Sequence, residues 1–475
     1  MSTYVHSSPW HEERTPPSSG SWLETAPFQL PAGIKVCIEQ LVHIETSVFL
    51  AVVFLIGVVI RMVALLGMRQ ISHLPGRQAG ADGIEFERLA RALAEGRGYV
   101  KLNGLPTAFR APGFPIFVSF IYRMSRMSVS IATLSFPVLG AAICVVTYLL
   151  AREVVPETTA RLAALLGTVY FPAIYLSTIW FSEPLFMFVF ALSLTMFLVY
   201  RRTGHCSTLA VAGLLFSYSV LIRPFAILML PGLLVLDFIY SRKRRLTVPL
   251  LLVCSLVPTL LWTARNYRIY HHFVLVTTNG GSTFYGGNND TVLRVPEQMG
   301  SWVSTVRLPG RDQVVATHNE YDHDQVEWRL GKQWMRSHLT VMPILITMKL
   351  VRFVLPDFAS QSRKFAALSV VTTLPFLPLW ILGLRASAER KNWTVAWSVV
   401  HMGVAMTVFT AMAFWGSPRF RDGVAPLLFI YSAFGLQRWF ASRLPHSEAV
   451  RKGMAVAEDP HALATTEPAQ RRLRA

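Results

Sequence analysis

Apolar residues along this chain gather in long runs instead of alternating with polar residues. Most runs approach the roughly 20 residues with which an α-helix crosses about 30 Å of hydrocarbon. There are ten such runs: Ser47–Gly67, Ser128–Leu150, Leu162–Trp180, Pro184–Tyr200, Thr208–Ile222, Pro224–Tyr240, Leu246–Ala264, Phe365–Leu384, Trp393–Phe414 and Val424–Phe440. The pattern predicts an all-α integral membrane protein with about ten transmembrane helices, in a domain that spans residues 46–440.

Two long stretches of chain separate some of these runs. They are residues 68–127, here called the first long segment, and residues 265–364, the second long segment. Each contains a shorter apolar stretch that is interrupted by proline or by a cation, Pro112–Tyr122 in the first and Val341–Leu355 in the second. Such stretches favour helices that lie along the membrane interface or dip into it.

Composition and charge agree with a membrane protein. The chain is 52% hydrophobic and 15% charged, and its net charge of +18 would indicate a nucleic-acid partner in a soluble protein. Here the basic residues occupy short connections between apolar runs: Arg152, Arg161, Arg201, Arg202, Arg242, Lys243, Arg244, Arg245, Arg385, Arg390 and Lys391. The positive-inside rule makes these connections cytoplasmic, although the first long segment also carries cations, because long loops largely escape the rule. We therefore expect both long segments outside an inner (plasma) membrane, and no nucleic-acid partner.

The two ends and the cysteines add little chemistry. Residues 1–45 and 441–475 are predicted to be flexible cytoplasmic tails. The N-terminal tail lacks the basic start, apolar core and cleavage site of a removable signal peptide, so no such peptide is predicted. The four cysteines are scattered, without a Cys-x-x-Cys pair: Cys37, Cys144, Cys206 and Cys254. Neither a disulfide framework nor a zinc knuckle is predicted.

Candidate chemistry begins in the first long segment. Asp82 and Glu85 precede an apolar stripe at helical spacing: Phe86, Leu89, Ala90 and Leu93. Asp82 is therefore either the N-cap of an amphipathic surface helix or a functional carboxylate. Arg110 stands at the proline-rich entry to the next apolar stretch, where it either contacts an anion or extends its charged end to lipid phosphate.

Four further charged residues stand at predicted outer ends of helices. Glu183 lies beside Pro184 at a helix start, where the helix dipole alone would favour a carboxylate. A charge at this depth is otherwise costly and marks a functional site. The other three are arginines: Arg223, Arg265 and Arg419. Taken one at a time, each is explained as an anchor at the membrane interface, whereas the three together can converge on one anion.

A glycine-rich stretch, residues 277–290, carries interleaved amides and aromatic rings, including Asn279 and Asn288. Amides can bind sugar hydroxyls and rings can stack on a sugar, although a plain surface loop has the same composition. A later cluster contains metal-ligand types without a recognised spacing: His318, Asp322, His323 and Asp324. We predict no metal site there, and a divalent metal elsewhere stays an open alternative.

Taken in order, these segments resemble the polytopic C-type glycosyltransferases. The similar group is glycosyltransferase family 39-like, which includes protein O-mannosyltransferases and lipid A aminoarabinose transferases, and the resemblance covers about Ser47 to Phe440. It is carried by Asp82 with Phe86 and Gly96-Arg-Gly-Tyr99, Arg110-Ala-Pro-Gly-Phe-Pro115, Ser182-Glu183, Leu221-Ile-Arg223-Pro224, Trp262-Thr-Ala-Arg265-Asn-Tyr267, Thr278-Asn279-Gly-Gly281 with Gly287-Asn288-Asn289, and Ser417-Pro-Arg419-Phe420. Relatives more often have two prolines after the basic residue at position 110, and some have aspartate at position 183.

The resemblance implies the C-type fold and an inverting transfer of a sugar from a polyprenyl-phosphate carrier to an acceptor hydroxyl or amine on the outer side. Asp82 is then the catalytic base, and the phosphate is held by the basic side chains Arg110, Arg223, Arg265 and Arg419. Sugar or acceptor contacts fall to Glu85, Glu183, Asn279 and Asn288. The leaving group is already an anion, so no nucleotide-binding fold or acid catalyst is required. The acceptor, whether lipid, glycan or protein, is left open.

Two other functions remain as alternatives. A glycan ligase or polymerase of the same fold would use the same site with a wider cleft. A lipid-linked-sugar transporter or flippase is less favoured, because the ionisable residues gather at helix ends and not at mid-membrane.

Overall fold

The computed structural model describes residues 44–71, 80–356 and 363–443. Residues 45–436 form one compact unit, and the other unit, the two chain ends, lies almost entirely outside the described residues. The predicted tails, at 1–45 and 441–475, therefore fall almost wholly outside the description. In the described ranges all regular structure is helical, apart from an isolated bridge between Val100 and Pro106. The all-α prediction is confirmed.

Six helical stretches are long and apolar enough to cross a membrane, counted over the described residues. They lie in α3 (Thr46–Ile71), α6 (Val129–Arg152), α9 (Glu183–Thr203), α12 (Arg244–Tyr270), α18 and α19 together (Arg363–Thr373 and Phe376–Ser387) and α20 (Val395–Ala413). Each corresponds to one of the ten predicted runs. Their apolar surfaces need a hydrocarbon environment, so the protein is an integral membrane protein.

The other predicted runs also form helices, but in shorter pieces. The run Leu162–Trp180 divides into α7 (Glu157–Val169) and α8 (Phe171–Leu176). The break precedes Pro172, which lacks an N–H group and therefore cannot continue the hydrogen-bond ladder of α7. The remaining pieces are α10 (Cys206–Ile222), the 3-10 helix η2 (Pro224–Met229), α11 (Leu230–Tyr240) and α22 (Ala425–Arg443).

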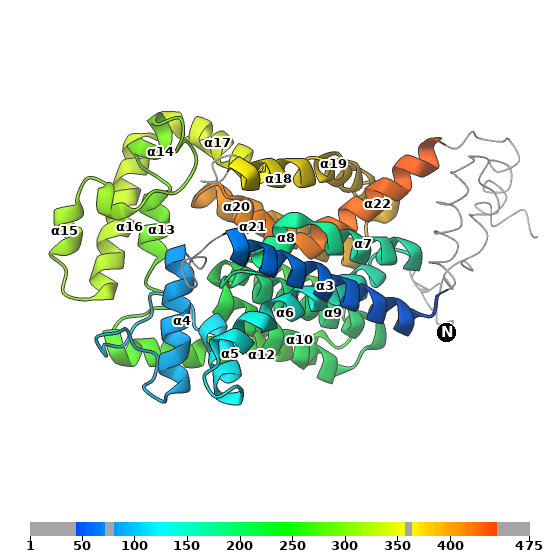
Figure 1. Ribbon diagram of the computed structural model, residues 1–475, viewed down its shortest axis with the longest axis horizontal. Coiled ribbons are helices and arrows are strands. Elements are labelled where there is room, and N and C mark those ends of the chain that lie inside the picture. The colour runs from blue at the N-terminus through cyan, green and yellow to red at the C-terminus, as the bar shows by residue number, and fades with distance from the viewer. Residues whose placement is uncertain (1–43, 72–79, 357–362, 444–475) are drawn as a thin grey trace, which may run out of the picture. The chain divides into compact units, whose positions relative to one another are not determined.

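The two long segments carry short helices. The first contains α4 (Gly80–Ala94) and α5 (Gly113–Met124). The second contains α13 (Gly280–Gly286), α14 (Asp290–Arg294), α15 (Arg311–Val315), α16 (Glu320–Ser337) and α17 (Met342–Val354). Helices α5 and α17 are the two stretches predicted to lie at the interface, and the chain bends by 78° between α16 and α17. Within the compact unit, α13–α16 gather at one end with α4 beside them (Figure 1).

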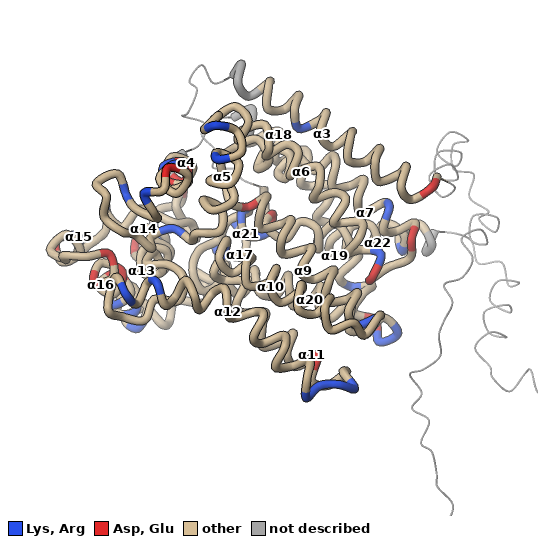
Figure 2. Tube along the Cα trace, turned by 90° about the horizontal axis from the view of Figure 1, so that it is seen from below, with Lys and Arg blue, Asp and Glu red and all other residues tan. Residues whose placement is uncertain are grey.

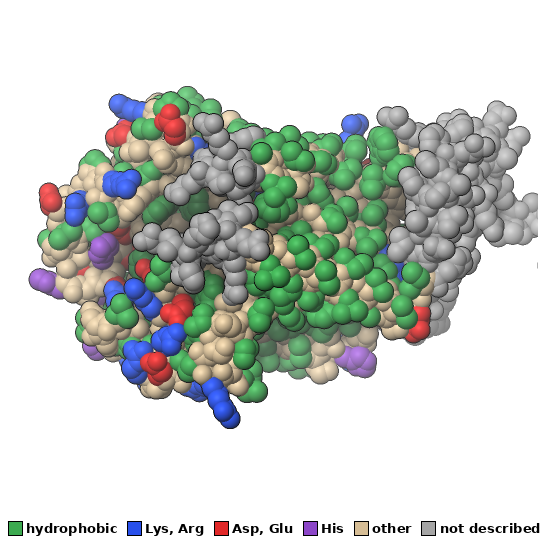
Figure 3. All heavy atoms as spheres, viewed as in Figure 1, with side chains coloured by type: hydrophobic (Ala, Val, Ile, Leu, Met, Phe, Trp, Pro, Cys, Tyr) green, Lys and Arg blue, Asp and Glu red, His purple; other side chains and the backbone are tan. Residues whose placement is uncertain are grey.

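Charged side chains gather at the ends of the membrane-crossing helices. The basic connection between α11 and α12 lies at the opposite end of α12 from α16 (Figure 2). On the face seen in Figure 3, hydrophobic side chains cover α3 and its neighbours, whereas charged side chains gather over α4 and α13–α16. An apolar band between two charged ends is the surface that a bilayer requires.

Packing of α4 and α5 fixes the start of the candidate site. Three residues of the predicted stripe of α4, Phe86, Leu89 and Ala90, are buried, and Leu93 is half-buried. The ring of Phe86 meets that of Phe114 on α5 edge to face, with centroids 5.1 Å apart. Burying one such ring contributes roughly 2–3 kcal/mol. Helix α5 in turn approaches α10 at Gly113, where an added Cβ would lie 2.6 Å from the Ile222 side chain. This close contact brings the residue before α5 next to the end of α10.

Candidate active site

Six charged side chains form one chain of alternating sign, here called the charged network. In order they are Glu85, Arg110, Asp82, Arg419, Glu183 and Arg223. They come from α4, the loop before α5, α21 (Pro418–Asp422), the start of α9 and the end of α10. All six were predicted as site residues, and the fold brings them together from positions up to 337 residues apart.

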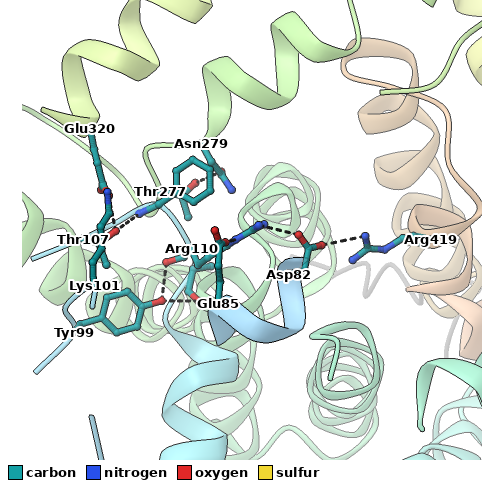
Figure 4. A network of polar contacts seen from close by, with 12 residues as sticks. Asp82, Glu85, Tyr99, Lys101, Thr107, Arg110, Thr277, Asn279, Glu320 and Arg419 are labelled. Atoms are coloured by element: carbon teal, nitrogen blue, oxygen red, sulfur yellow. Dashed lines mark hydrogen bonds and ion pairs between the residues drawn. The ribbon is translucent and has the colours of Figure 1, made fainter. Parts of the chain in front are cut away.

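Arg110 links the two carboxylates of α4. Its Nε donates to Glu85 Oε2 at 2.6 Å, and its Nη2 donates to Asp82 Oδ1 at 2.8 Å (Figure 4). The guanidinium also lies 5.7 Å from the Phe86 ring centroid and 5.2 Å from that of Phe109. These rings limit the positions that the guanidinium can take.

Arg419 continues the network from the other side of Asp82. Its Nη1 donates to Asp82 Oδ2 at 3.2 Å, and its Nε donates to Glu183 Oε1 at 2.6 Å. The guanidinium stacks over Phe181, 4.2 Å from the ring centroid. Figure 4 shows Asp82 between Arg110 and Arg419, so both of its oxygens accept from arginine. Asp82 lies in the first turn of a helix that begins at Gly80, inside the helix and not at the predicted N-cap.

Glu183 closes the buried end of the network. Its side chain is fully buried, and Oε1 also meets Arg223 Nη2 at 2.5 Å. The second oxygen, Oε2, is buried without a hydrogen-bond partner in the described structure. Two guanidinium groups and the N-terminal end of α9 together compensate the carboxylate charge.

A second set of contacts holds α21, and with it Arg419. Arg421 donates to the backbone carbonyls of Val354 at 2.5 Å and Leu355 at 3.2 Å, at the end of α17. Its neighbour Asp422 accepts a hydrogen bond from the Tyr170 hydroxyl at 2.7 Å, between α7 and α8. These buried contacts anchor the C-terminal end of α21, the short helix that presents Arg419.

The formal charges of the network balance. Three carboxylates face three guanidinium groups, so its formal charge is zero. Burial raises the pKa of Asp82, but the guanidinium groups of Arg110 and Arg419 outweigh burial and leave that pKa below its usual value. Burial lowers the pKa of Arg419, and the carboxylates of Glu183 and Asp82 outweigh it and raise that pKa above its usual range. Asp82 is therefore a carboxylate at neutral pH.

The two ends of the network differ in exposure, and the Glu183–Arg223 end is the more buried, with Arg223 16% exposed. The side chain of Glu85 is 43% exposed, those of Arg419 and Asp82 are 32% and 28%, and that of Glu183 is 0%. A ligand that approaches from solvent therefore meets the α4 carboxylates and Arg419 first, and Glu183 and Arg223 lie behind them.

Arg265, also predicted to bind the phosphate, makes other contacts. Its Nη1 donates to the Thr107 carbonyl at 2.6 Å and its Nη2 to the Tyr99 carbonyl at 3.0 Å. The guanidinium lies over the Trp262 ring, 4.6 Å from its centroid. These contacts tie α12 to the loop that leads to Arg110, and none of them reaches the charged network.

The two predicted asparagines also differ. Asn279 is partly exposed and accepts a hydrogen bond from the Thr277 hydroxyl at 2.9 Å. The backbone N–H of Thr278 donates to the Ala108 carbonyl at 3.0 Å, which brings Asn279 near the Arg110 loop. Asn288 is fully buried, donates to the carbonyls of Phe284 and Ala413, and accepts from Lys349 Nζ at 2.8 Å. It connects packed elements instead of facing a ligand.

Glu320, in the first turn of α16, was missed by the sequence analysis. Its carboxylate accepts hydrogen bonds from the Thr107 hydroxyl at 2.7 Å, the Ala108 N–H at 3.0 Å, the Tyr270 hydroxyl at 2.8 Å and the Thr278 hydroxyl at 3.2 Å, and it pairs with Lys101 (Figure 4). Glu320 and Arg265 thus both hold the loop of residues 99–108. In the sequence Glu320 follows the N-cap Asn319 and has the appearance of an ordinary helix-start carboxylate.

Metal-ligating side chains do not cluster in the described part of the chain. Over the described ranges, no group of three histidine, cysteine, aspartate or glutamate side chains is close enough to hold a metal ion. Asp324 of the His318–Asp324 cluster accepts the Gly281 N–H at 2.6 Å. In the charged network, the Arg419 guanidinium already lies between Asp82 and Glu183, so this arrangement does not fit a divalent metal bridging them. Cys144, Cys206 and Cys254 are free thiols, and Cys37 lies outside the described residues.

Comparison by sequence finds no match among family models or curated proteins. Comparison of structure finds the oligosaccharyltransferase AglB of Archaeoglobus fulgidus. Its complex with an inhibitory peptide and a dolichol-phosphate has a TM-score of 0.50 and 16% identity, covering 86% of this chain and 54% of that chain. A form tethered with an acceptor peptide containing the NVT sequon has a TM-score of 0.52 and 16% identity, covering 86% and 53%.

A further match is ArnT from Cupriavidus metallidurans bound to undecaprenyl phosphate, with a TM-score of 0.39 and 15% identity, covering 84% of this chain and 80% of that chain. The chain spans about half the length of the AglB chains that it matches. The similarity to AglB shows that the chain has the C-type glycosyltransferase fold, and the fold prediction is confirmed.

Proposed function

We propose that this protein is a membrane glycosyltransferase that moves a sugar from a polyprenyl-phosphate carrier to an acceptor hydroxyl or amine on the outer side of the membrane. The charged network carries the proposal. It places a partly exposed carboxylate between two arginines at one end of a set of membrane-crossing helices. A base next to two phosphate-binding groups is what sugar transfer from a lipid phosphate requires.

The phosphate of the donor binds at Arg110 and Arg419, with Arg223 behind them. A guanidinium presents several N–H groups in one plane and matches phosphate oxygens in pairs. As the sugar leaves, its phosphate gains negative charge, and the fixed cations stabilise that charge. The lipid chain of the carrier stays in the bilayer, against the apolar helices.

Asp82 acts as the base. It removes the proton of the acceptor as the acceptor oxygen or nitrogen attacks the anomeric carbon, and the bond from that carbon to the phosphate oxygen breaks. A single displacement of this kind inverts the anomeric centre. Glu85 and Asn279 are partly exposed near Arg110, and they are the candidates to bind sugar or acceptor hydroxyls.

A second candidate is transfer of a whole glycan from its lipid carrier. The observation in its favour is the similarity of fold to AglB, an oligosaccharyltransferase. It would use the same base and the same arginines, with a larger donor. A transporter is less favoured, because the network lies at helix ends and not in the middle of membrane-crossing helices.

The test compares lipid-linked sugars in a strain lacking the protein with those in the same strain carrying either the wild-type or the Asp82→Asn form. We expect a lipid-phosphate sugar to accumulate without the protein, to disappear with wild type and to persist with Asp82→Asn. Accumulation of a lipid-diphosphate glycan would select the second candidate. Unchanged lipids in the deletion strain, with no lipid phosphate released by the purified protein, would contradict both.

A further inference from the structure

We infer that Arg110 and Arg419 serve both the base and the leaving group, and that protonation of Asp82 releases their N–H groups to the departing phosphate. This inference rests on the proposed function and concerns the same site. It makes proton transfer and phosphate stabilisation two parts of one event, because they use the same two guanidinium groups.

The two arginines bind their carboxylates in the same way. Each uses Nε for a second carboxylate, Glu85 for Arg110 and Glu183 for Arg419. Each directs one Nη group to Asp82, at 2.8 Å and 3.2 Å. If Asp82 loses its charge, both guanidinium groups remain anchored through Nε while one Nη group on each becomes available. Anchored donors need little reorganisation to bind a new anion.

The reaction keeps the charge of the site in balance. When the acceptor attacks, its O–H or N–H bond breaks and the proton passes to Asp82, whose charge changes from −1 to zero. The electron pair of the bond between the anomeric carbon and the phosphate oxygen stays on that oxygen, and the phosphate changes from −1 to −2. The total charge of the site is unchanged. The negative charge moves from one side of the two arginines to the other.

Asp82 and the phosphate compete for the two arginines before the reaction. While Asp82 is ionised, it occupies the Nη groups that the phosphate would use, and both of its oxygens are engaged. Asp82 should therefore weaken binding of a lipid phosphate, although it belongs to the catalytic site. An uncharged residue at this position should bind the phosphate more tightly and transfer sugar poorly.

The experiment measures affinity for farnesyl phosphate, a short polyprenyl monophosphate, on the full-length purified protein in detergent. Asp82→Asn should bind about tenfold more tightly than wild type, because the Nη groups that Asp82 engages would then be available to the phosphate. Glu87→Gln is the matched control. It removes one negative charge from the same helix, but Glu87 contacts Arg91 and Tyr122 instead of the network. Its affinity should equal that of wild type.

Arg110→Ala and Arg419→Ala distinguish failure of the arginine-sharing inference from failure of the proposed phosphate site. If both weaken binding while Asp82→Asn fails to strengthen it, the sharing of arginines is wrong and the proposed function stands. If both bind as wild type does, the phosphate does not bind here, and the proposed site falls with the inference. If Asp82→Asn and Glu87→Gln strengthen binding equally, only general electrostatics acts, and the inference is overturned. Asp82→Ala, measured in parallel, provides the same reading if the asparagine variant fails to fold.

Discussion

Asp82 carries its charge between two guanidinium groups, and this placement sets how it can act as a base. The arginines hold the pKa of Asp82 below its usual value, so without a bound donor the Asp82 carboxylate has a low affinity for a proton. A phosphate that draws the Nη groups away would leave Asp82 with less compensation in a partly buried place, and its proton affinity would rise. If Asp82 is the base, as proposed, binding of the donor would therefore strengthen it.

Replacing Asp82 tests this role directly. Asp82→Asn keeps the size of the side chain and removes the proton acceptor, so transfer should slow by about 10²–10⁴-fold. Asparagine can still cap or start a helix, and the protein should remain folded. The measurement is sugar transfer by purified protein, with thermal unfolding as the check on folding. Near-normal transfer by a folded Asp82→Asn protein would remove Asp82 as the base, and Glu85 would be tested next.

The pH profile gives an independent prediction. The base must be ionised, and the pKa of Asp82 lies below its usual value because Arg110 and Arg419 outweigh burial. The kcat/KM of the free enzyme should therefore stay level as pH falls from 7 and decline only below about pH 4, the usual range of aspartate. In Arg419→Gln one compensating charge is lost, so the decline should begin at higher pH. If kcat/KM of Arg419→Gln declines at the same low pH as wild type, Asp82 is not the base that sets this decline.

Arg110 should not tolerate lysine. A lysine ammonium keeps the charge but cannot present a planar fork to Glu85 and Asp82 together. We expect Arg110→Lys to lower kcat/KM for the donor by about 10–100-fold, and Arg110→Ala to lower it further. Arg123→Lys is the control, because Arg123 donates to the Leu93 carbonyl at the end of α4. Equal activity of the two lysine variants would show that charge alone suffices at position 110.

All members of the charged network could be selected from the sequence, but their pairing could not. A charge at the predicted end of an apolar run is costly and therefore conspicuous, which identified Glu183, Arg223 and Arg419. Which carboxylate meets which arginine depends on packing between elements far apart in the chain, as with Asp82 and Arg419. Arg265 has the same sequence character as Arg223, yet packing directs it to backbone carbonyls.

At the scale of elements, two helices from outside the network hold the loop that presents Arg110. Arg265 on α12 and Glu320 on α16 both bind residues 99–108, Arg265 through backbone carbonyls and Glu320 through a hydroxyl and a backbone N–H. Glu320 itself gathers donors from this loop, from α12 and from the stretch before α13. The loop before α5 is therefore held by contacts between the two long segments. None of the contacts of Glu320 reaches the charged network, so we expect α16 to act by positioning that loop.

Glu320→Gln tests this positioning role. The amide keeps the shape but loses the charge and one acceptor, and it leaves Lys101 without its ion pair, so stability should fall by about 1.5–3 kcal/mol. Backbone amides of residues 99–110 should exchange hydrogen faster, and kcat should fall while affinity for farnesyl phosphate changes little. Asp312→Asn, an exposed change in the same segment, should alter neither. Unchanged exchange in the loop would contradict the role of Glu320.

The sequence predicted most elements, for physical reasons. The stripe of α4 has helical spacing, and the long apolar runs have few structures open to them other than helices in a membrane. The division into α7 and α8 was missed, because apolar content alone does not show where a chain turns. The clue was Pro172, which ends the hydrogen-bond ladder of α7. Glu320 was missed because a helix-start carboxylate is common and its five partners come from three other parts of the chain.

At the scale of the whole compact unit, the charged network and the most basic short connection lie at opposite ends of membrane-crossing helices. Helix α9 starts with Glu183 in the network and ends near Arg201 and Arg202. Helix α12 starts after the basic connection and ends beside α16. The positive-inside rule predicts that the basic connections are cytoplasmic, and on that prediction we propose that the site faces outward. A donor with its phosphate at the outer surface and an acceptor outside the cell would both reach it.

Cysteine labelling decides this orientation. In a background without the four native cysteines, Asn103→Cys in the first long segment should react with a membrane-impermeant maleimide in intact cells. Thr203→Cys, at the far end of α9, should react only after the membrane is opened. Both positions are exposed in the structure, whereas Asn288 is buried and would not report. The reverse pattern would place Asp82 in the cytoplasm, and an acceptor outside the cell would then be wrong. Labelling of both positions in intact cells would mean that α9 does not cross the membrane, which would contradict the topology itself.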